Sequence, residues 1–232
     1  MLNVFIGYDQ NESIAFHVLA HSIMRRASRP VSITPLYLPQ LQKAGYYTRK
    51  RDRKQSTDFT FSRFLTPYLA KTSGVSIFMD TDMLCLGDIC ELEAMANANP
   101  YCDVLVAQHD YTPKSELKFL GQEQTRYPCK NWSSLMVFNG HRSCVKALTP
   151  DYVNAASPMD LHQFKWAQEI GALPLEWNWL VGEYEPRPIE QIKMLHYTLG
   201  GPYFADYENC DFAAEWFSEY DSSNSCKTRT FY

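Results

Sequence analysis

Residues Val75–Ile89 read VSIFMDTDMLCLGDI, and this stretch decides the fold. Its first five residues are mostly apolar and partly β-branched, a composition that predicts a buried strand over Val75–Met79. The strand runs directly into Asp80-Thr81-Asp82. Because side chains alternate along an extended chain, the two carboxylates, two residues apart, are expected to point to the same side.

Two explanations remain open for this D-x-D tripeptide. Like charges this close repel each other, and a divalent cation that bridges them to an anionic ligand would remove the conflict. Oxygen ligands of this kind suit Mg²⁺ or Mn²⁺. The alternative is a polar turn after a core strand, since the tripeptide is common. Its position directly after a buried strand favours the metal site.

The composition excludes several classes of protein. The chain has 232 residues and a formal net charge of −4, which argues against a general nucleic-acid binder. Its seven cysteines are odd in number and show no C-x-x-C spacing, so they predict neither a disulfide framework nor a zinc site. The chain shows no signal peptide and no apolar run of about 20 residues. We therefore expect a soluble, cytoplasmic protein, with membrane association at most peripheral.

Strand and helix patterns alternate along the chain. Strands are predicted over 2–6, 31–38, 75–79, 103–108, 133–139 and 194–197, and helices over 12–27, 59–70, 92–98, 159–169 and 213–220. This alternation predicts an α/β fold in which helices flank a mixed, mostly parallel sheet. We expect one domain over 1–220 and a poorly ordered tail over 221–232. The glycine-rich patterns of dinucleotide folds and P-loops are absent.

Two basic features have more than one reading. Arg63 lies among apolar helix positions, and a buried guanidinium needs a carboxylate or phosphate partner. It is either a structural ion pair, for which Asp80 is a candidate, or a phosphate contact or orienter of the metal site. The segment 46–54 carries five basic residues and is either a solvated loop or a mobile lid over phosphates or acceptor.

Taken in order, these motifs resemble GT-A glycosyltransferases, most of all the family-eight retaining enzymes (glycogenin-like and lipopolysaccharide galactosyl- or glucosyltransferase-like). The resemblance covers nearly the whole chain. Its segments are VFIGYDQNESIAFHVLAHSI, FSRFLTPYLAKTSGVSIFMDTDMLCLGDI, NWSSLMVFN, LHQF, LPLEWNWL and HYTLGGPYF. The last of these resembles the family's closing H-x-x-G-x-x-K-P-W.

The resemblance implies a set of site residues. The metal ligands for Mn²⁺ or Mg²⁺ would be Asp80, Asp82 and His196. The nucleotide-sugar donor would be bound by Gly7, Tyr8, Asp9, Arg63, Asp80, Thr81, Asp82, Gly200 and Gly201. Catalytic roles would fall to Gln163, beneath the anomeric carbon, and to Asp82 and Arg63. Without the resemblance, a histidine in the setting of His196 is more often a satisfied interior residue.

The chain also departs from the family pattern. The closing lysine, a donor-phosphate contact, has no equivalent, so Lys193, Arg187 or the segment 49–54 would have to supply that charge. Trp132 stands where the family has a sugar-contacting asparagine, and the adjacent Asn131 is expected to point elsewhere. His162 replaces an acid.

The sequence thus predicts a metal-dependent hexosyltransferase that uses a nucleotide-sugar, with a UDP-sugar favoured, and a hydroxyl acceptor on a glycan or glycolipid. Retention of configuration is expected from the resemblance. Stereochemistry is open from the residues alone, because Asp110, Asp160 and Glu176 are available as a base for inversion. The alternatives are a non-catalytic nucleotide-sugar or glycan-binding protein and a sugar nucleotidyltransferase. The latter usually has a Gly-rich loop and a lysine after the first strand, which this chain lacks.

Overall fold

The computed structural model describes residues 1–51, 55, 57–72, 74–114, 117–118, 122–123 and 128–225. Its main sheet has the strand order β2-β1-β3-β8-β5-β9. These strands are β1 (Leu2–Tyr8), β2 (Val31–Tyr37), β3 (Val75–Met79), β5 (Val104–Ala107), β8 (Leu135–Asn139) and β9 (Ile170–Leu173). The pairs β1–β2, β1–β3 and β5–β9 are parallel, whereas β8 is antiparallel to both of its neighbours. The predicted mixed, mainly parallel sheet is therefore confirmed.

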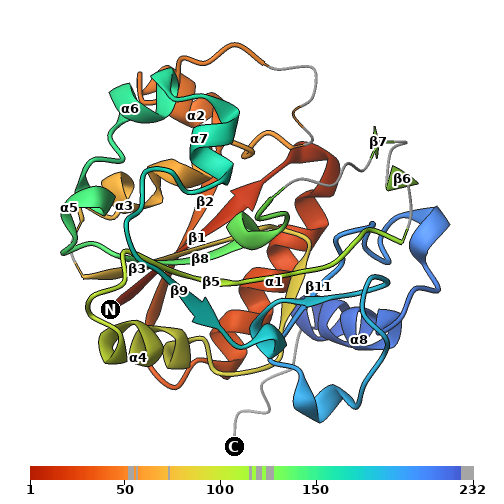
Figure 1. The fold of residues 1–232 in the computed structure, drawn as a ribbon. Helices are drawn as coiled ribbons and strands as arrows, with labels where there is room; N and C mark the ends of the chain where they lie inside the picture. Colours follow the sequence, from red (N-terminus) through yellow and green to blue (C-terminus); the bar gives the residue numbers. More distant parts are fainter. Residues whose placement is uncertain are drawn as a thin grey trace, which may run out of the picture.

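Helices lie on both faces of this sheet (Figure 1). They are α1 (Ser13–Arg26), α2 (Leu38–Lys43), α3 (Thr66–Leu69), α4 (Cys90–Ala98), α5 (Ser143–Lys146), α6 (Pro150–Ala155) and α7 (Pro158–His162). The last helix, α8 (Ala213–Asn224), packs against α1. The alternation of side chains along β3 divides the core between the two faces. Ile77 belongs to the same core cluster as Leu19 of α1, and Phe78 to the same cluster as Leu161 of α7. No helix among the described residues is long and apolar enough to cross a bilayer.

A second, three-stranded sheet places the histidine next to the acidic residues. It consists of β4 (Met83–Cys85), β10 (Trp179–Leu180) and β11 (Met194–His196) in the order β10-β11-β4. Strand β4 follows Asp82 directly and pairs antiparallel with β11, so that Met83 lies opposite His196. The backbone N–H of Tyr197 also donates to the Asp82 carbonyl at 2.9 Å. His196, which lies 114 positions after Asp82 in the chain, is thereby held beside it.

Three predicted helices differ from the structure. The predicted helix over 159–169 ends with α7 at His162, because Phe164 takes a positive φ of 56° and the chain then enters β9. The predicted helix over 59–70 is instead a 3₁₀ turn (Ser62–Leu65) followed by α3, which has a proline in its first turn, where proline is tolerated. The last helix continues to Asn224 instead of ending at 220, so the first residues of the predicted tail are helical.

Parts of two predicted segments lie outside the described residues. These are residues 226–232 of the predicted tail and residues 52–54 of the predicted basic loop. The described residues after β5 include the short strand pair β6 (Leu117–Lys118) and β7 (Gln122–Glu123).

The carboxylate of Glu219 joins α8 to α1. Its side chain is 2% exposed and lies 2.6 Å from Nδ1 of His21, 2.8 Å from Nη1 of Arg26 and 3.5 Å from Nη1 of Arg25. We expect Glu219→Gln to lower the free energy of unfolding by about 2 kcal/mol, because the substitution removes the charge that pairs with the three basic side chains. The loss is not larger because these side chains are partly solvated and would recover hydration. Urea unfolding would measure the change. Glu208→Gln, an exposed acid outside this cluster, is the control, and equal stabilities of the two variants would contradict the prediction.

Candidate metal and donor site

A cavity of about 750 Å³ opens where β3 ends. Its described lining comes from segments that are distant in the chain: Glu12, residues within 55–63, the pair Asp80 and Asp82, residues within 131–134, residues within 157–163, and His196 with Thr198. Asp80 and Asp82 follow the end of β3, and His196 is the last residue of β11. The lining includes five of the residues that the sequence predicted for the site: Arg63, Asp80, Asp82, Gln163 and His196.

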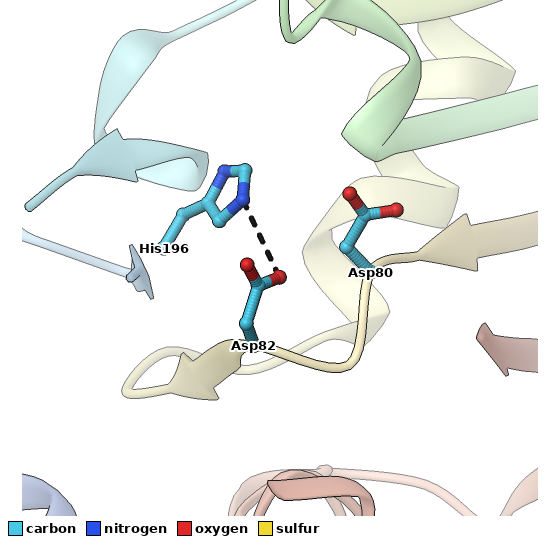
Figure 2. A group of neighbouring side chains, drawn as sticks. All are labelled: Asp80, Asp82 and His196. Carbon is cyan, nitrogen blue, oxygen red and sulfur yellow. Dashed lines mark ion pairs between the residues drawn. The ribbon is translucent and has the colours of Figure 1, made fainter. Parts of the chain in front are cut away.

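Asp80, Asp82 and His196 form a cluster that could hold a metal ion. One ligand atom from each residue lies within 4.8 Å of the other two. Figure 2 shows the two carboxylates and the imidazole facing one another, with Asp82 Oδ1 at 3.4 Å from His196 Nε2. Two carboxylate oxygens and one imidazole nitrogen are a donor set that Mn²⁺ and Mg²⁺ accept. The residues present thus fit the divalent cation that the sequence predicted.

A chain of directional hydrogen bonds fixes the tautomer of His196. Ser134 Oγ donates to the carbonyl of Asn131 at 2.6 Å, so it must accept from Asn178 Nδ2 at 2.8 Å. The amide oxygen of Asn178 then faces His196 Nδ1 at 2.9 Å, and because that oxygen can only accept, Nδ1 carries the proton. The lone pair of Nε2 is left facing Asp82. Hydrogen bonding of the remote ring nitrogen is how proteins orient metal-binding histidines.

Arg63 anchors the other acid. Its Nη1 lies 2.8 Å from Asp80 Oδ1 and donates to the carbonyl of Ser133 at 2.8 Å. The guanidinium also lies over the rings of Phe59 and Phe78, with distances from Cζ to the ring centroids of 5.4 Å and 4.9 Å. The ion pair left open by the sequence is therefore present, and Arg63 also lines the cavity. Among the described residues, Arg63 is the only lysine or arginine that lines the cavity.

Glu12 adds a carboxyl group that the sequence analysis missed. It is 3% exposed, lines the cavity, and accepts a hydrogen bond of 2.6 Å from the hydroxyl of Tyr203. Burial, reinforced by the nearby carboxylate of Asp82, raises the pKa of Glu12 to about 8. With Glu12 neutral, the charged acids and bases of the described lining are the two aspartates and Arg63, and a divalent cation would add positive charge beside the aspartates.

The end of β1 supports the cavity without lining it. Gly7 allows close packing, since a Cβ there would lie 2.4 Å from the ring of Phe59, a cavity residue. Tyr8 packs edge-to-face against Phe16 at 5.4 Å between centroids. Asp9 is buried, caps the turn that precedes α1 and accepts from the backbone N–H of Asp58 at 3.1 Å.

The remaining predicted donor residues also lie outside the described lining. Thr81 is fully buried, and its hydroxyl has no hydrogen-bond partner among the described residues. Gly200 has a φ of 147° and follows the strand that bears His196. A Cβ on Gly201 would lie 2.1 Å from the ring of Tyr203, so this glycine makes room for the tyrosine that reaches Glu12.

Asn131 lies in the cavity wall, contrary to the expectation that it would point elsewhere. Its backbone is left-handed, with a φ of 62°. Nδ2 of Asn131 donates to the hydroxyls of Tyr111 at 2.8 Å and Thr198 at 3.2 Å. Trp132 instead donates from Nε1 to the carbonyl of His109 at 3.0 Å.

Three of the described basic candidates for the missing family lysine are engaged elsewhere. Lys193 pairs with Glu91, and the guanidinium of Arg187 stacks on Trp179 with 3.9 Å between Cζ and the ring centroid. Arg49 donates to the carbonyl of Val153 at 2.7 Å at the end of α6. None of these three basic residues is part of the described cavity lining. The same holds for the candidate bases Asp110, Asp160 and Glu176.

Asn178→Ala is expected to weaken Mn²⁺ binding by about 10- to 100-fold, because His196 would lose the acceptor that fixes its tautomer and ring orientation. Titration of Mn²⁺ in the presence of UDP would measure the loss. Asn209→Ala, which removes an exposed amide outside the cavity, serves as the control. Unchanged Mn²⁺ affinity in folded Asn178→Ala would contradict this assignment.

Three solved structures with a similar fold are glycosyltransferases. The bifunctional glycosyltransferase WbbM matches with a TM-score of 0.63 and 18% identity over 94% of this chain and 49% of its own. GlyE of Streptococcus pneumoniae matches with a TM-score of 0.62 and 12% identity, over 94% and 59%. An active-site variant of LgtC matches with a TM-score of 0.56 and 11% identity, over 97% and 98%. This chain thus spans about half of WbbM, and its GT-A fold is confirmed.

Sequence comparison gives a nearer relative. No model of a known protein family matches the chain. Protein CDI of Arabidopsis thaliana is 43% identical over 226 residues, which cover 95% of this chain and 86% of the plant protein. Identity at this level over nearly the whole length shows common descent. The chain belongs to the same family as Protein CDI.

Proposed function

We propose that this protein is a metal-dependent glycosyltransferase. It would transfer a hexosyl unit from a nucleotide-sugar, with a UDP-sugar favoured, to a hydroxyl acceptor on a glycan or glycolipid. The observation that carries the proposal is the cluster of Asp80, Asp82 and His196 at the wall of a 750 Å³ cavity in a GT-A fold. The resemblance of the surrounding motifs to family-eight enzymes supports the finer assignment to that family.

The roles of the residues follow from their positions. Asp80, Asp82 and the Nε2 of His196 would hold Mn²⁺ or Mg²⁺, which supplies charge neutralisation for a diphosphate leaving group. Arg63 orients Asp80 through their 2.8 Å contact. Asn178 keeps the lone pair of His196 directed at the cluster. These groups would stabilise the charge that develops as the glycosidic bond breaks.

Retention is supported by where the acids lie. An inverting enzyme needs a carboxylate base on the acceptor side of the sugar. Among the described lining residues the only carboxyl groups are those of Glu12, Asp80 and Asp82, which interact electrostatically with one another. In the retaining assignment the leaving phosphate would take the acceptor proton, and Gln163, which lines the cavity, would lie beneath the anomeric carbon.

Donor hydrolysis tests the proposal. The purified protein would be incubated with UDP-, GDP- and CMP-sugars in Mn²⁺ or in EDTA, and released nucleotide would be assayed. We expect slow release from one donor that stops in EDTA. If neither release nor Mn²⁺-dependent nucleotide binding is found for any donor, the proposal fails. Glycan binding that needs no metal would favour a non-catalytic binding protein instead.

A further inference from the structure

Arg49 and Asn154 join two walls of the cavity from outside it. The first wall consists of lining residues within 55–63, and the second of lining residues within 157–163. Neither Arg49 nor Asn154 is part of the described lining. Both belong to a junction between residues 46–49, which precede the first wall, and residues 153–156, which directly precede the second. This junction therefore connects the segments from which both walls begin.

The guanidinium of Arg49 binds the carboxyl-terminal end of α6. Its Nη1 donates to the carbonyl of Val153 at 2.7 Å and to that of Ala156 at 2.6 Å, and it lies 3.3 Å from the carbonyl oxygen of Asn154. The direction of these hydrogen bonds is fixed, because a guanidinium only donates and a carbonyl only accepts. The last carbonyls of a helix have no partner within it, so Arg49 satisfies groups that would otherwise need water.

The same guanidinium contacts the first wall. Its Cζ lies 4.4 Å from the ring centroid of Phe61, a lining residue that is 4% exposed. The ring of Phe61 in turn packs against the imidazole of His162 in the second wall, with 5.7 Å between centroids. Arg49 thus touches one wall through Phe61 and holds the chain that leads into the other.

Asn154 fixes how the two segments of the junction are aligned. Its Oδ1 accepts from the backbone N–H of Thr48 at 2.8 Å, and its Nδ2 donates to the carbonyl of Tyr46 at 3.1 Å. A backbone N–H only donates and a carbonyl only accepts, so the orientation of this amide is determined. Each segment of the junction thereby contributes one side chain that binds the backbone of the other.

One residue separates the junction from α7. Arg49 holds the carbonyl of Ala156, and Ser157 then caps α7 by accepting from the backbone N–H of Asp160 at 3.0 Å. Gln163 directly follows this helix and lines the cavity. A short capped helix moves as a unit, so a shift at Ala156 would displace Gln163. The metal cluster would stay in place, because β3 and β11 hold it.

We propose that Arg49 is a positioning residue for sugar transfer, which holds α7, and with it Gln163, against the wall that contains Phe61. This inference rests on the proposed function, in which Gln163 would lie beneath the anomeric carbon. It assigns to Arg49 an effect on turnover and not on nucleotide binding. A misplacement of about 1 Å caused by a distant substitution can slow an enzyme about a hundredfold.

Steady-state hydrolysis of the donor that the wild type uses, in Mn²⁺, tests this role. Arg49→Gln removes the planar group with its several donors and is expected to lower kcat about 10- to 100-fold. The KM for the donor and the Kd of UDP, measured by calorimetry, are expected to stay within about twofold of the wild type, because the metal cluster is unchanged. Lys43→Gln also removes a positive charge, at an exposed residue outside the junction, and is the control.

A second variant reaches the junction from its other side. Asn154→Asp keeps the acceptor for the N–H of Thr48 but loses the donor to the carbonyl of Tyr46. It is expected to lower kcat in the same way as Arg49→Gln, with UDP affinity preserved. Urea unfolding checks that each variant is folded, and Asn154→Asp takes the place of Arg49→Gln if the latter does not fold.

A double-mutant cycle with Gln163 separates positioning from a general loss of structure. Gln163→Ala alone is expected to lower kcat. Adding Arg49→Gln to it is expected to cost no more than about twofold further, because the side chain that Arg49 positions is already gone. The same loss from Arg49→Gln in both backgrounds would show that Arg49 does not act through Gln163, and would overturn the inference.

The outcomes distinguish this inference from the proposed function. If the wild type hydrolyses a donor and Arg49→Gln has the same kcat, or loses as much UDP affinity as kcat, the positioning role is wrong while the transferase assignment stands. If the wild type neither releases nor binds nucleotide in Mn²⁺, the proposed function fails, and the positioning role fails with it.

Discussion

Asp82→Asn is expected to weaken Mn²⁺-dependent binding of UDP by about a hundredfold and to stop donor hydrolysis. Asp82 immediately precedes β4, in which Met83 pairs with His196, and Asp82 Oδ1 lies 3.4 Å from His196 Nε2. The amide is close to the carboxylate in size but carries no charge, so a ligand is weakened while packing is preserved. Calorimetric titration of UDP in Mn²⁺ and in EDTA measures the effect.

Two comparisons make this result specific. Asp206→Asn makes the same chemical change at an exposed residue outside the cavity and is expected to leave UDP affinity unchanged. Binding of UDP in EDTA is expected to be weak in all three proteins. If Asp82→Asn binds UDP in Mn²⁺ as tightly as the wild type, Asp82 is not a ligand and the cluster of Asp80, Asp82 and His196 is not the metal site.

The part of the fold that could be predicted is the part determined by local pattern. The strand Val75–Met79 has the predicted bounds, because a short apolar run that ends in two acids leaves few alternatives. The pairing of Arg63 with Asp80 was also among the sequence-based alternatives, since a guanidinium among apolar residues requires an anionic partner. The resemblance to known motifs added His196, which local pattern alone would have assigned to the core.

The rest of the site depends on contacts that no local pattern encodes. Asn178 faces His196 next to the paired strands β10 and β11. Glu12, in the cavity wall, is hydrogen-bonded by Tyr203, which lies 191 residues later in the chain. Asn131 lies in the cavity wall and has a left-handed backbone conformation. Asparagine adopts this conformation more readily than most residues, but the presence of an asparagine in the sequence does not predict it. The predicted end of the helix over 159–169 was wrong for a similar reason, because the sequence does not predict the positive φ of Phe164.

The largest effect on stability is expected at Asp103, a fully buried carboxylate at the start of β5. Its Oδ1 accepts from Nε of Arg142 at 2.9 Å, and its Oδ2 accepts from the backbone N–H groups of Gln168 and Glu169 at 2.8 Å and 3.0 Å. The side chain thereby ties β5 to the segment that leads into β9. Asp103→Asn has one acceptor oxygen for these three donors, so we expect a loss of about 3 kcal/mol in the free energy of unfolding.

The pH dependence of that loss identifies the charge as its cause. Burial alone would raise the pKa of Asp103, but the hydrogen bonds from the Glu169 N–H and from Arg142 outweigh burial and hold this pKa below its usual value of 3.8. A carboxyl whose pKa is lower in the folded than in the unfolded state stabilises the fold above the unfolded value and loses this contribution as pH falls through the folded value. The stability difference between wild type and Asp103→Asn should therefore be constant from about pH 7 to 5 and shrink below about pH 4. Urea unfolding at several pH values measures this difference, with the exposed Asp211→Asn as control. A difference that does not change down to pH 3 would show that Asp103 acts by shape and not by charge.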